Sequence, residues 1–193
     1  MNKHIIYLAA GNSRRFGENK LLYCFDGKPL YRYGLDMLQE VCRKREDCML
    51  YVVSQYEEIL QYASEQKIMA VNSPQSKEGM SYTIKAAIKA LENIQEEDFL
   101  IFVVADQPYL KAETLECLLD RATGDVETIS LSYRGTPGNP TVFAACLIPE
   151  LLGLKGDEGG RKVIRNHTCI YVEAAEEKEL RDVDTPKILK EHL

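Results

Sequence analysis

A loop near the amino terminus combines small residues, two glycines and three basic side chains. It spans residues 8–20, reads LAAGNSRRFGENK, and follows an apolar run that predicts a buried strand. Glycines and small residues let successive backbone N–H groups turn towards one point, which creates a nest for an anion. Arg15 and Lys20 can add a planar guanidinium and a mobile ammonium to that anion. The combination predicts a polyphosphate site, although each residue alone would equally suit a solvated glycine turn.

The spacing within this loop excludes two common nucleotide-binding motifs. A Walker loop has four residues between its glycines, but here five separate Gly11 from Gly17, and Lys20 is not adjacent to the second glycine. The dinucleotide fingerprint G-x-G-x-x-G is also absent from the sequence. We therefore expect a nucleotide loop of a third kind, and an NAD-dependent oxidoreductase is disfavoured.

A single acidic residue follows the most apolar segment of the chain. Residues 99–104 read FLIFVV, which is typical of a central strand, and Asp106 and Pro108 come soon after them. Ligands of open parallel sheets bind at the carboxyl ends of the strands, so we expect Asp106 to face the first loop. A carboxylate facing a polyphosphate needs a divalent cation between them, and Mg²⁺ typically takes one or two carboxylates plus phosphate oxygens. The alternative is an ordinary turn aspartate.

Strand-like and helix-like patterns alternate along most of the chain. We predict strands at residues 4–9, 49–53, 68–71, 99–104 and 128–133, and helices at residues 29–43, 55–66, 81–94 and 111–122. This alternation favours a layered α/β fold with a largely parallel sheet. Residues 134–140 predict a turn-rich loop, and residues 141–143 a hairpin or an antiparallel edge strand. No repeat or linker interrupts the sequence, so we expect residues 1–193 to form one domain.

The composition argues against several protein classes. The chain has 24 basic and 30 acidic residues and a net charge of −6, which disfavours a nucleic-acid-binding protein. No apolar run is long enough to cross a membrane, and the first residues lack a secretory signal. We expect a cytoplasmic protein with no nucleic-acid or membrane partner. The six cysteines lack metal-site spacing, so we expect mostly buried thiols without disulfides.

The candidate segments also resemble a known family. The pattern L-A-A-G-x-S-x-R-F-G-x-x-K at residues 8–20, with A-D-Q-P at 105–108, is similar to the nucleotidyltransferases of molybdenum cofactor assembly. The molybdenum cofactor cytidylyltransferases are the most similar branch. The resemblance extends over nearly the whole chain through four further segments, which are GMS at 79–81, GNP at 138–140, GDEGGR at 156–161 and DVDTP at 182–186.

This resemblance implies a fold and a reaction. The fold is a Rossmann-like three-layer α/β/α sandwich with a mostly parallel mixed sheet, as in nucleotide-diphospho-sugar transferases. The reaction is Mg²⁺-dependent transfer of CMP from CTP to the phosphate of molybdenum-bound molybdopterin, with release of pyrophosphate. Expected partners are CTP, the molybdopterin-type acceptor and a molybdoenzyme that receives the product. The pair Ala9 and Ala10 favours cytosine, because guanylyl relatives usually carry glycine at the second position.

The resemblance also implies roles for individual residues. The catalytic residues would be Arg15, Lys20 and Asp106, of which Asp106 holds the metal together with Asp184. The nucleotide-binding set is Leu8, Ala9, Ala10, Gly11, Asn12, Ser13, Arg15, Lys20, Gly79, Met80, Ser81 and Asp106. The acceptor-binding set is Gly138, Asn139, Pro140, Asp157, Gly159 and Arg161.

Some of these positions have simpler explanations, and other functions stay open. Asp157 would equally suit the cap of a short helix running from Gly160, and Asp184 the cap of the last helix. His167 could reach the acceptor or merely end a helix.

The alternative functions are a same-fold nucleotidyltransferase that uses GTP or a sugar or alcohol phosphate, and a non-catalytic carrier of the molybdenum cofactor. The presence of both Lys20 and Asp106 disfavours a carrier.

Overall fold

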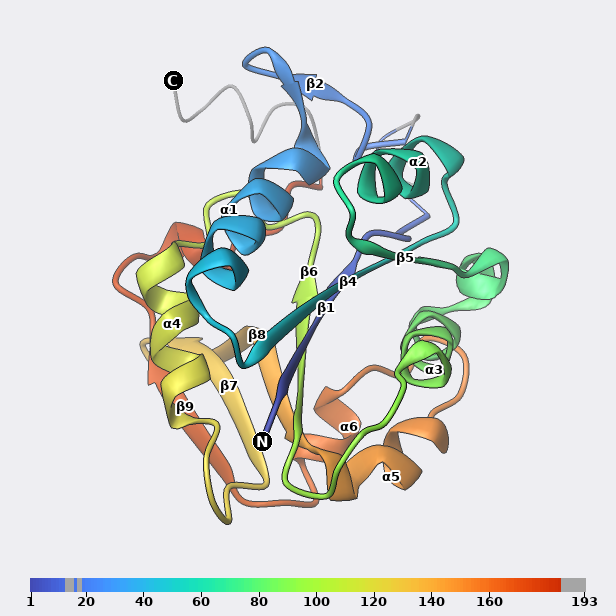
Figure 1. Ribbon diagram of the computed structural model, residues 1–193. Helices are drawn as coiled ribbons and strands as arrows, with labels where there is room; N and C mark the ends of the chain where they lie inside the picture. The colour runs from blue at the N-terminus through green and yellow to red at the C-terminus, as the bar shows by residue number, and fades with distance from the viewer. Residues whose placement is uncertain (13–15, 17–18, 185–193) are drawn as a thin grey trace.

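A seven-stranded mixed sheet forms the centre of the molecule (Figure 1). The computed structural model describes residues 1–12, 16 and 19–184. The strands lie in the order β5-β4-β1-β6-β8-β7-β9, and β8 is antiparallel to both of its neighbours. Their bounds are β1 Lys3–Leu8, β4 Cys48–Ser54, β5 Met69–Asn72, β6 Phe99–Val104, β7 Thr128–Tyr133, β8 Thr136–Ala144 and β9 Cys169–Glu173. A two-stranded hairpin, β2 Cys24–Phe25 and β3 Lys28–Pro29, stands apart from this sheet.

Helices cover both faces of the sheet. Successive side chains of a strand point to opposite faces, so Ile5 and Tyr7 of β1 belong to one core cluster and Ile6 and Leu8 to another. The first cluster packs against α1 Leu30–Lys44, α2 Glu57–Glu65 and α4 Ala112–Arg121. The second packs against α3 Met80–Ala90, α5 Ile148–Leu152 and α6 Arg161–Ile164. The predicted three-layer α/β/α fold with a mostly parallel mixed sheet is therefore confirmed (Figure 1).

The prediction of a loop over residues 134–140 is wrong beyond its first two residues. Arg134 and Gly135 both have positive φ, 48° and 79°, and make a tight two-residue turn between β7 and β8. Thr136 already belongs to β8, which lies between β6 and β7 and is not an edge strand. Its prolines are accommodated beside an irregularity, because the register with β7 shifts between Ser130 and Leu131.

Two further expectations differ from the structure. Helix α3 ends at Ala90, not at residue 94, because the chain becomes extended at Leu91 and turns through Asn93, whose φ is 55°. Leu91 and Ile94 nevertheless pack against the second cluster. The apolar residues at helical spacing after Ala90 are therefore buried, although the chain there is not helical. The expectation of mostly buried thiols is wrong, since none of the six cysteines is buried. Cys117, for example, lies on the solvent side of α4 between the buried Leu115 and Leu118.

A small third cluster joins three parts of the chain that are far apart in sequence. Phe16 from the first loop, Leu30 at the start of α1 and Val183 near the carboxyl terminus are all buried together. Burying a large apolar side chain contributes roughly 1.5–3 kcal/mol, so this cluster fixes the carboxyl-terminal segment beside the first loop. Three short 3₁₀ helices complete the fold: η1 Pro74–Glu78, η2 Ala145–Leu147 and η3 Glu177–Leu180. Across the residues described, no helix has the length and apolarity to span a bilayer.

His167 ties the start of β7 to α5. Its Nδ1 lies 3.2 Å from Glu127 Oε1 and its Nε2 lies 2.8 Å from Glu150 Oε1. Hydrogen bonds to Glu127 and Glu150 raise the pKa of this histidine above its ordinary value. Two cavities open at the carboxyl ends of β1 and β6, and the His167 side chain lines neither of them. The position of His167 therefore supports a structural role and not contact with an acceptor.

Replacing His167 by glutamine should make stability less dependent on pH above about pH 5. Since the folded state raises the pKa, the stabilising contribution is fully present below the unfolded value of about 6.5 and is lost as pH rises through the folded pKa. Urea unfolding at about pH 5.5 and about pH 8.5 should give a larger difference between wild type and His167→Gln at the lower pH. Equal differences at both pH values would contradict the ion-pair assignment.

Candidate nucleotide and metal site

The candidate site forms where β1 and β6 end. These strands are parallel neighbours with Leu8 opposite Val104, so the residues that follow them emerge side by side. The backbone N–H of Ala105 donates to the Leu8 carbonyl oxygen at 3.1 Å, which extends the pairing by one residue. The first loop and Asp106 therefore meet at the carboxyl edge of the sheet, where ligands of parallel α/β folds bind.

Lys20 is a buried residue at the centre of a charge cluster whose two carboxylates are partly exposed. Its Nζ is 2.7 Å from Asp106 Oδ2 and 3.2 Å from Asp184 Oδ1, and the residue is only 8% exposed. Burial disfavours the charged ammonium, but the ion pairs with Asp106 and Asp184 outweigh it and raise the pKa of Lys20. The lysine is therefore positively charged at neutral pH and offsets part of the negative charge of the two carboxylates.

Contacts with the Asp106 turn hold the carboxyl-terminal segment in place. The N–H of Val183 donates to the Asp106 carbonyl oxygen at 2.9 Å, and the Val183 side chain is fully buried. Gln107 Nε2 donates to Asp182 Oδ1 at 2.8 Å and to the Leu180 carbonyl oxygen at 3.0 Å. These bonds place Asp182 and Asp184 beside Asp106, although Asp106 is more than 70 positions away from both in sequence.

A cavity of about 320 Å³ opens beside the charge cluster. Ten of the predicted site residues line it, namely Leu8, Ala10, Gly11, Asn12, Lys20, Gly79, Met80, Asp106, Asn139 and Asp157. Ala9 and Ser81, which were also predicted, are fully buried and do not line the cavity, so they act from behind its wall. The predicted Ser13 and Arg15 and the segment after Asp184 lie outside the described residues.

A second cavity of about 260 Å³ adjoins the first and shares Asn139 and Asp157 with it. Gly159 and Arg161 from the predicted acceptor set line this second cavity. Its floor is apolar and includes Leu8, Met80, Ile84, Phe102 and Val104.

The remaining predicted acceptor residues have other places. Gly138 and Pro140 line neither cavity, and a Cβ at Gly138 would lie 2.6 Å from Leu180 Cδ2, so that glycine allows close packing. The alternative explanation of Asp157 as a helix cap is wrong, because the N-cap of α6 is Gly160 and no side chain caps it.

The segment at residues 79–81, from the predicted nucleotide-binding set, contacts the segment at residues 156–161, from the predicted acceptor-binding set, through two glycines. Gly79 has a φ of 141°, and a Cβ there would lie 2.3 Å from the Gly156 carbonyl oxygen. The N–H of Ser81 donates to the same oxygen at 3.0 Å. A side chain at residue 79 would therefore separate the nucleotide segment from the acceptor segment.

Several cavity residues were missed in the sequence. These are Leu21, Ser76, Thr83, Val104, Ala105 and Asp182. Asp182 had a visible signal, because it stands two residues before Asp184 in the D-V-D run. Ser76 and Thr83 had none, since a serine or threonine beside a helix is common; here Thr83 Oγ1 donates to Ser76 Oγ at 2.7 Å.

The arrangement of Asp106 and Asp184 fits a divalent cation. One cationic nitrogen already lies within 3.2 Å of an oxygen of each, so both carboxylates face a common point. Carboxylate oxygens with water and phosphate oxygens are the ligands that Mg²⁺ and Mn²⁺ prefer. Asp106 and Asp184 would hold such an ion. Among the residues described, no group of three or more acidic, histidine or cysteine side chains forms a complete metal site.

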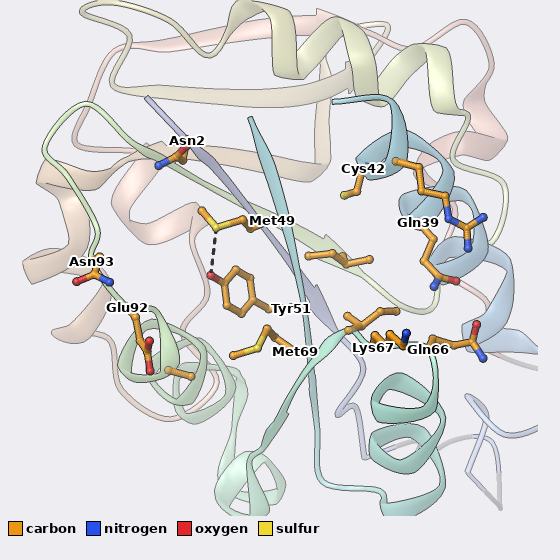
Figure 2. A pocket seen from close by; sticks show the side chains of 14 residues that line it. Asn2, Gln39, Cys42, Met49, Tyr51, Gln66, Lys67, Met69, Glu92 and Asn93 are labelled. Atoms are coloured by element: carbon orange, nitrogen blue, oxygen red, sulfur yellow. Dashed lines mark hydrogen bonds between the residues drawn. The ribbon is translucent and has the colours of Figure 1, made fainter. Parts of the chain in front are cut away.

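A larger cavity of about 660 Å³ lies at the other end of the sheet, around the amino ends of β4 and β5 (Figure 2). Met49, Met69 and Tyr51 line it, and the Tyr51 hydroxyl donates to Met49 Sδ at 3.9 Å. None of the predicted site residues lies there. Cavity size therefore does not identify the site, whereas the charged groups do.

Comparison with known proteins identifies the family of the chain. Residues 5–170 match the model of the MobA-like NTP transferase domain. The purine catabolism protein PucB of Bacillus subtilis (strain 168) is 29% identical over 193 residues, which cover 94% of this chain and 91% of that protein.

Solved structures share the fold. Rv0371c from Mycobacterium tuberculosis H37Rv has a TM-score of 0.76 over 98% of each chain at 20% identity. A manganese complex of Rv0371c has a TM-score of 0.71 over 100% of each chain at 19% identity. Molybdopterin-guanine dinucleotide biosynthesis protein A of Archaeoglobus fulgidus has a TM-score of 0.69 over 97% of this chain and 95% of that one, at 19% identity. The family predicted from the motifs is confirmed: the chain belongs to the MobA-like NTP transferase domain family.

Proposed function

We propose that the protein is a Mg²⁺-dependent cytidylyltransferase that transfers CMP from CTP to the phosphate of molybdenum-bound molybdopterin and releases pyrophosphate. The observation that carries this proposal is the contact of Lys20 with Asp106 and Asp184 beside a cavity lined by the first loop. We assign the reaction to a single domain of residues 1–193 in the cytoplasm, where nucleoside triphosphates are available.

The two cavities suggest how substrates divide between them. The first cavity, with Gly11, Asn12 and Lys20, suits the triphosphate, because backbone N–H groups and an ammonium both favour anions. The second cavity has an apolar floor and Arg161 at its wall, which suits an acceptor with a flat ring system and an anionic group. Asn139 and Asp157, which line both, would lie where the two substrates meet.

Catalysis in such a site depends on charge neutralisation and positioning. The acceptor phosphate is already anionic near neutral pH, so no strong general base is required. Neither of the histidines that the structure describes, His4 and His167, lines the two cavities. Asp106 and Asp184 would hold a divalent cation, which would supply charge neutralisation to the triphosphate. The ammonium of Lys20 would add positive charge beside the phosphates of the nucleotide and of pyrophosphate.

The choice of nucleotide rests on a smaller feature. Ala10 lines the first cavity, and its methyl group stands where guanylyl relatives usually have glycine. The added methyl narrows the site and favours the smaller pyrimidine. The Archaeoglobus fulgidus protein, whose name includes a guanine dinucleotide, keeps GTP as the second candidate. The name of the Bacillus subtilis relative suggests that the product serves an enzyme of purine breakdown.

Purified protein with Mg²⁺, CTP and molybdenum-bound molybdopterin should release pyrophosphate, measured by a coupled phosphate assay. Release with GTP in place of CTP would move the assignment to guanylyl transfer. Release only with a sugar or alcohol phosphate would change the acceptor. Absence of release with every nucleotide and acceptor would favour a carrier of the cofactor and overturn the proposal.

Asp106→Asn should lower kcat roughly 10²–10³-fold, because one charged member of the clamp is lost while the side-chain volume is kept. Asp120→Asn is a matched control, since Asp120 is an exposed partner of Arg45 on the surface. Circular dichroism and pyrophosphate release should be measured for both variants. Full activity of Asp106→Asn would show that the metal is held elsewhere.

Lys20→Met should abolish turnover but increase the affinity for Mn²⁺ alone roughly tenfold, because the ammonium that competes for the two carboxylates is removed. Free Mn²⁺ can be measured by electron paramagnetic resonance. Lys28→Met removes one charge from the surface pair with Asp36 and serves as the control. Weaker Mn²⁺ binding by Lys20→Met than by the control would contradict the competition between lysine and metal.

A further inference from the structure

The turn between β4 and α2 supports the first loop through its carbonyl groups. Three consecutive side chains each donate a hydrogen bond to one of three consecutive carbonyl oxygens. The pairs are Ser54 Oγ with Ala9, Gln55 Nε2 with Ala10 and Tyr56 Oη with Gly11, each at 2.7 Å. We call residues 54–56 the loop brace. It is 45 residues away from the loop in sequence, and no predicted site residue belongs to it.

The brace orients the amide groups of the loop. In a trans peptide the carbonyl of one residue and the N–H of the next point in opposite directions. Holding the carbonyls of residues 9–11 on the brace therefore turns the N–H groups of residues 10–12 to the other side. Ala10, Gly11 and Asn12 line the first cavity, whereas the brace residues do not. The carbonyls, which would repel an anion, are thus kept away from the cavity.

Gln55 has a second contact that extends the brace. Its Nε2 lies 3.1 Å from Asn12 Oδ1, and Asn12 Nδ2 in turn donates to the Lys77 carbonyl oxygen at 3.0 Å. This chain of bonds joins the turn, the first loop and the segment that leads to Gly79. The Gln55 side chain thus connects two walls of the first cavity, which are the first loop and the segment before Gly79.

The contacts of Gln55 distinguish loop positioning from helix capping. Ser54 also stabilises its own turn, because its Oγ accepts from the N–H of Tyr56 at 3.0 Å as well as donating to Ala9. No side chain caps α2. Within the described part of the chain, the hydrogen bonds of the Gln55 side chain go to residues 10 and 12. The hydrogen bonds of the Gln55 side chain therefore support the first loop and not helix α2.

We propose that Gln55 is a positioning residue that holds the first loop ready for the triphosphate, with Ser54 and Tyr56 fixing the carbonyls on either side. This inference rests on the proposed nucleotide function. A loop that is already ordered pays less conformational entropy when the ligand binds, so the brace strengthens nucleotide binding without touching the nucleotide.

Gln55→Leu tests the brace, because it keeps the side-chain size and removes the donor. Gln61→Leu is the matched control, since Gln61 lies on the exposed face of α2 and its side chain donates to Glu65 on the same helix. In Gln55→Leu, hydrogen exchange of the amides of residues 10–12 should accelerate in ligand-free protein, while β1 and β6 stay protected. The KM for CTP should rise roughly tenfold with kcat within about twofold, as for a lost contribution to uniform binding.

Tyr56→Phe gives an independent measurement, because it removes only the hydroxyl that donates to Gly11. It should accelerate exchange in the same amides and raise the KM for CTP in the same direction. Loop exchange and KM equal to those of Gln61→Leu would overturn the inference. Faster exchange throughout β1 and β6 would also overturn it, because Gln55 would then stabilise the fold in general. If wild-type protein transfers no nucleotide, the proposed function fails, and the exchange data still decide whether the brace orders the loop.

Discussion

The ion pairs of Lys20 with Asp106 and Asp184 are the interaction on which the site depends. The three residues come from the first loop, the end of β6 and the carboxyl-terminal segment, separated by 86 and 164 positions from the lysine. A buried ammonium is costly unless carboxylates surround it, and two carboxylates repel each other unless a cation lies between them. The buried ammonium of Lys20 is therefore stabilised by the two carboxylates, and the three segments meet around it.

The neighbouring structure keeps this cluster in place with uncharged contacts. Val183 is buried with Phe16 and Leu30, so the carboxyl-terminal segment is anchored by apolar packing as well as by charge. Gly79 lies against Gly156 where no side chain would fit, which brings the segment predicted to bind the nucleotide onto the segment predicted to bind the acceptor. The loop brace adds hydrogen bonds to carbonyls that face away from the cavity. Charge, packing and backbone orientation together produce a site that is arranged before a ligand arrives.

The sequence predicted most of the layered fold and some of the site. Strands β6 and β7 have the predicted bounds, because a continuous apolar run leaves few alternatives. The prediction failed for residues 136–140 of β8, where prolines and glycines suggested a loop but pairing with β7 and a register shift accommodate them, whereas residues 141–143 form the antiparallel strand of a hairpin as predicted. It also failed for the cysteines, which occupy exposed or half-buried positions in both strands and helices, where nothing in the local sequence marks their exposure.

The sequence by itself determined the family, the layered α/β pattern and the segments at 8–20 and 105–108, because these depend on residue types at fixed local spacing. Only the tertiary structure decided that Asp184 shares Lys20 with Asp106, that Asp182 lines the cavity and that Gln55 supports Asn12. Side-chain contacts between distant segments follow from how the sheet and helices pack. A common glutamine or aspartate in a turn carries no local sign of its distant partner.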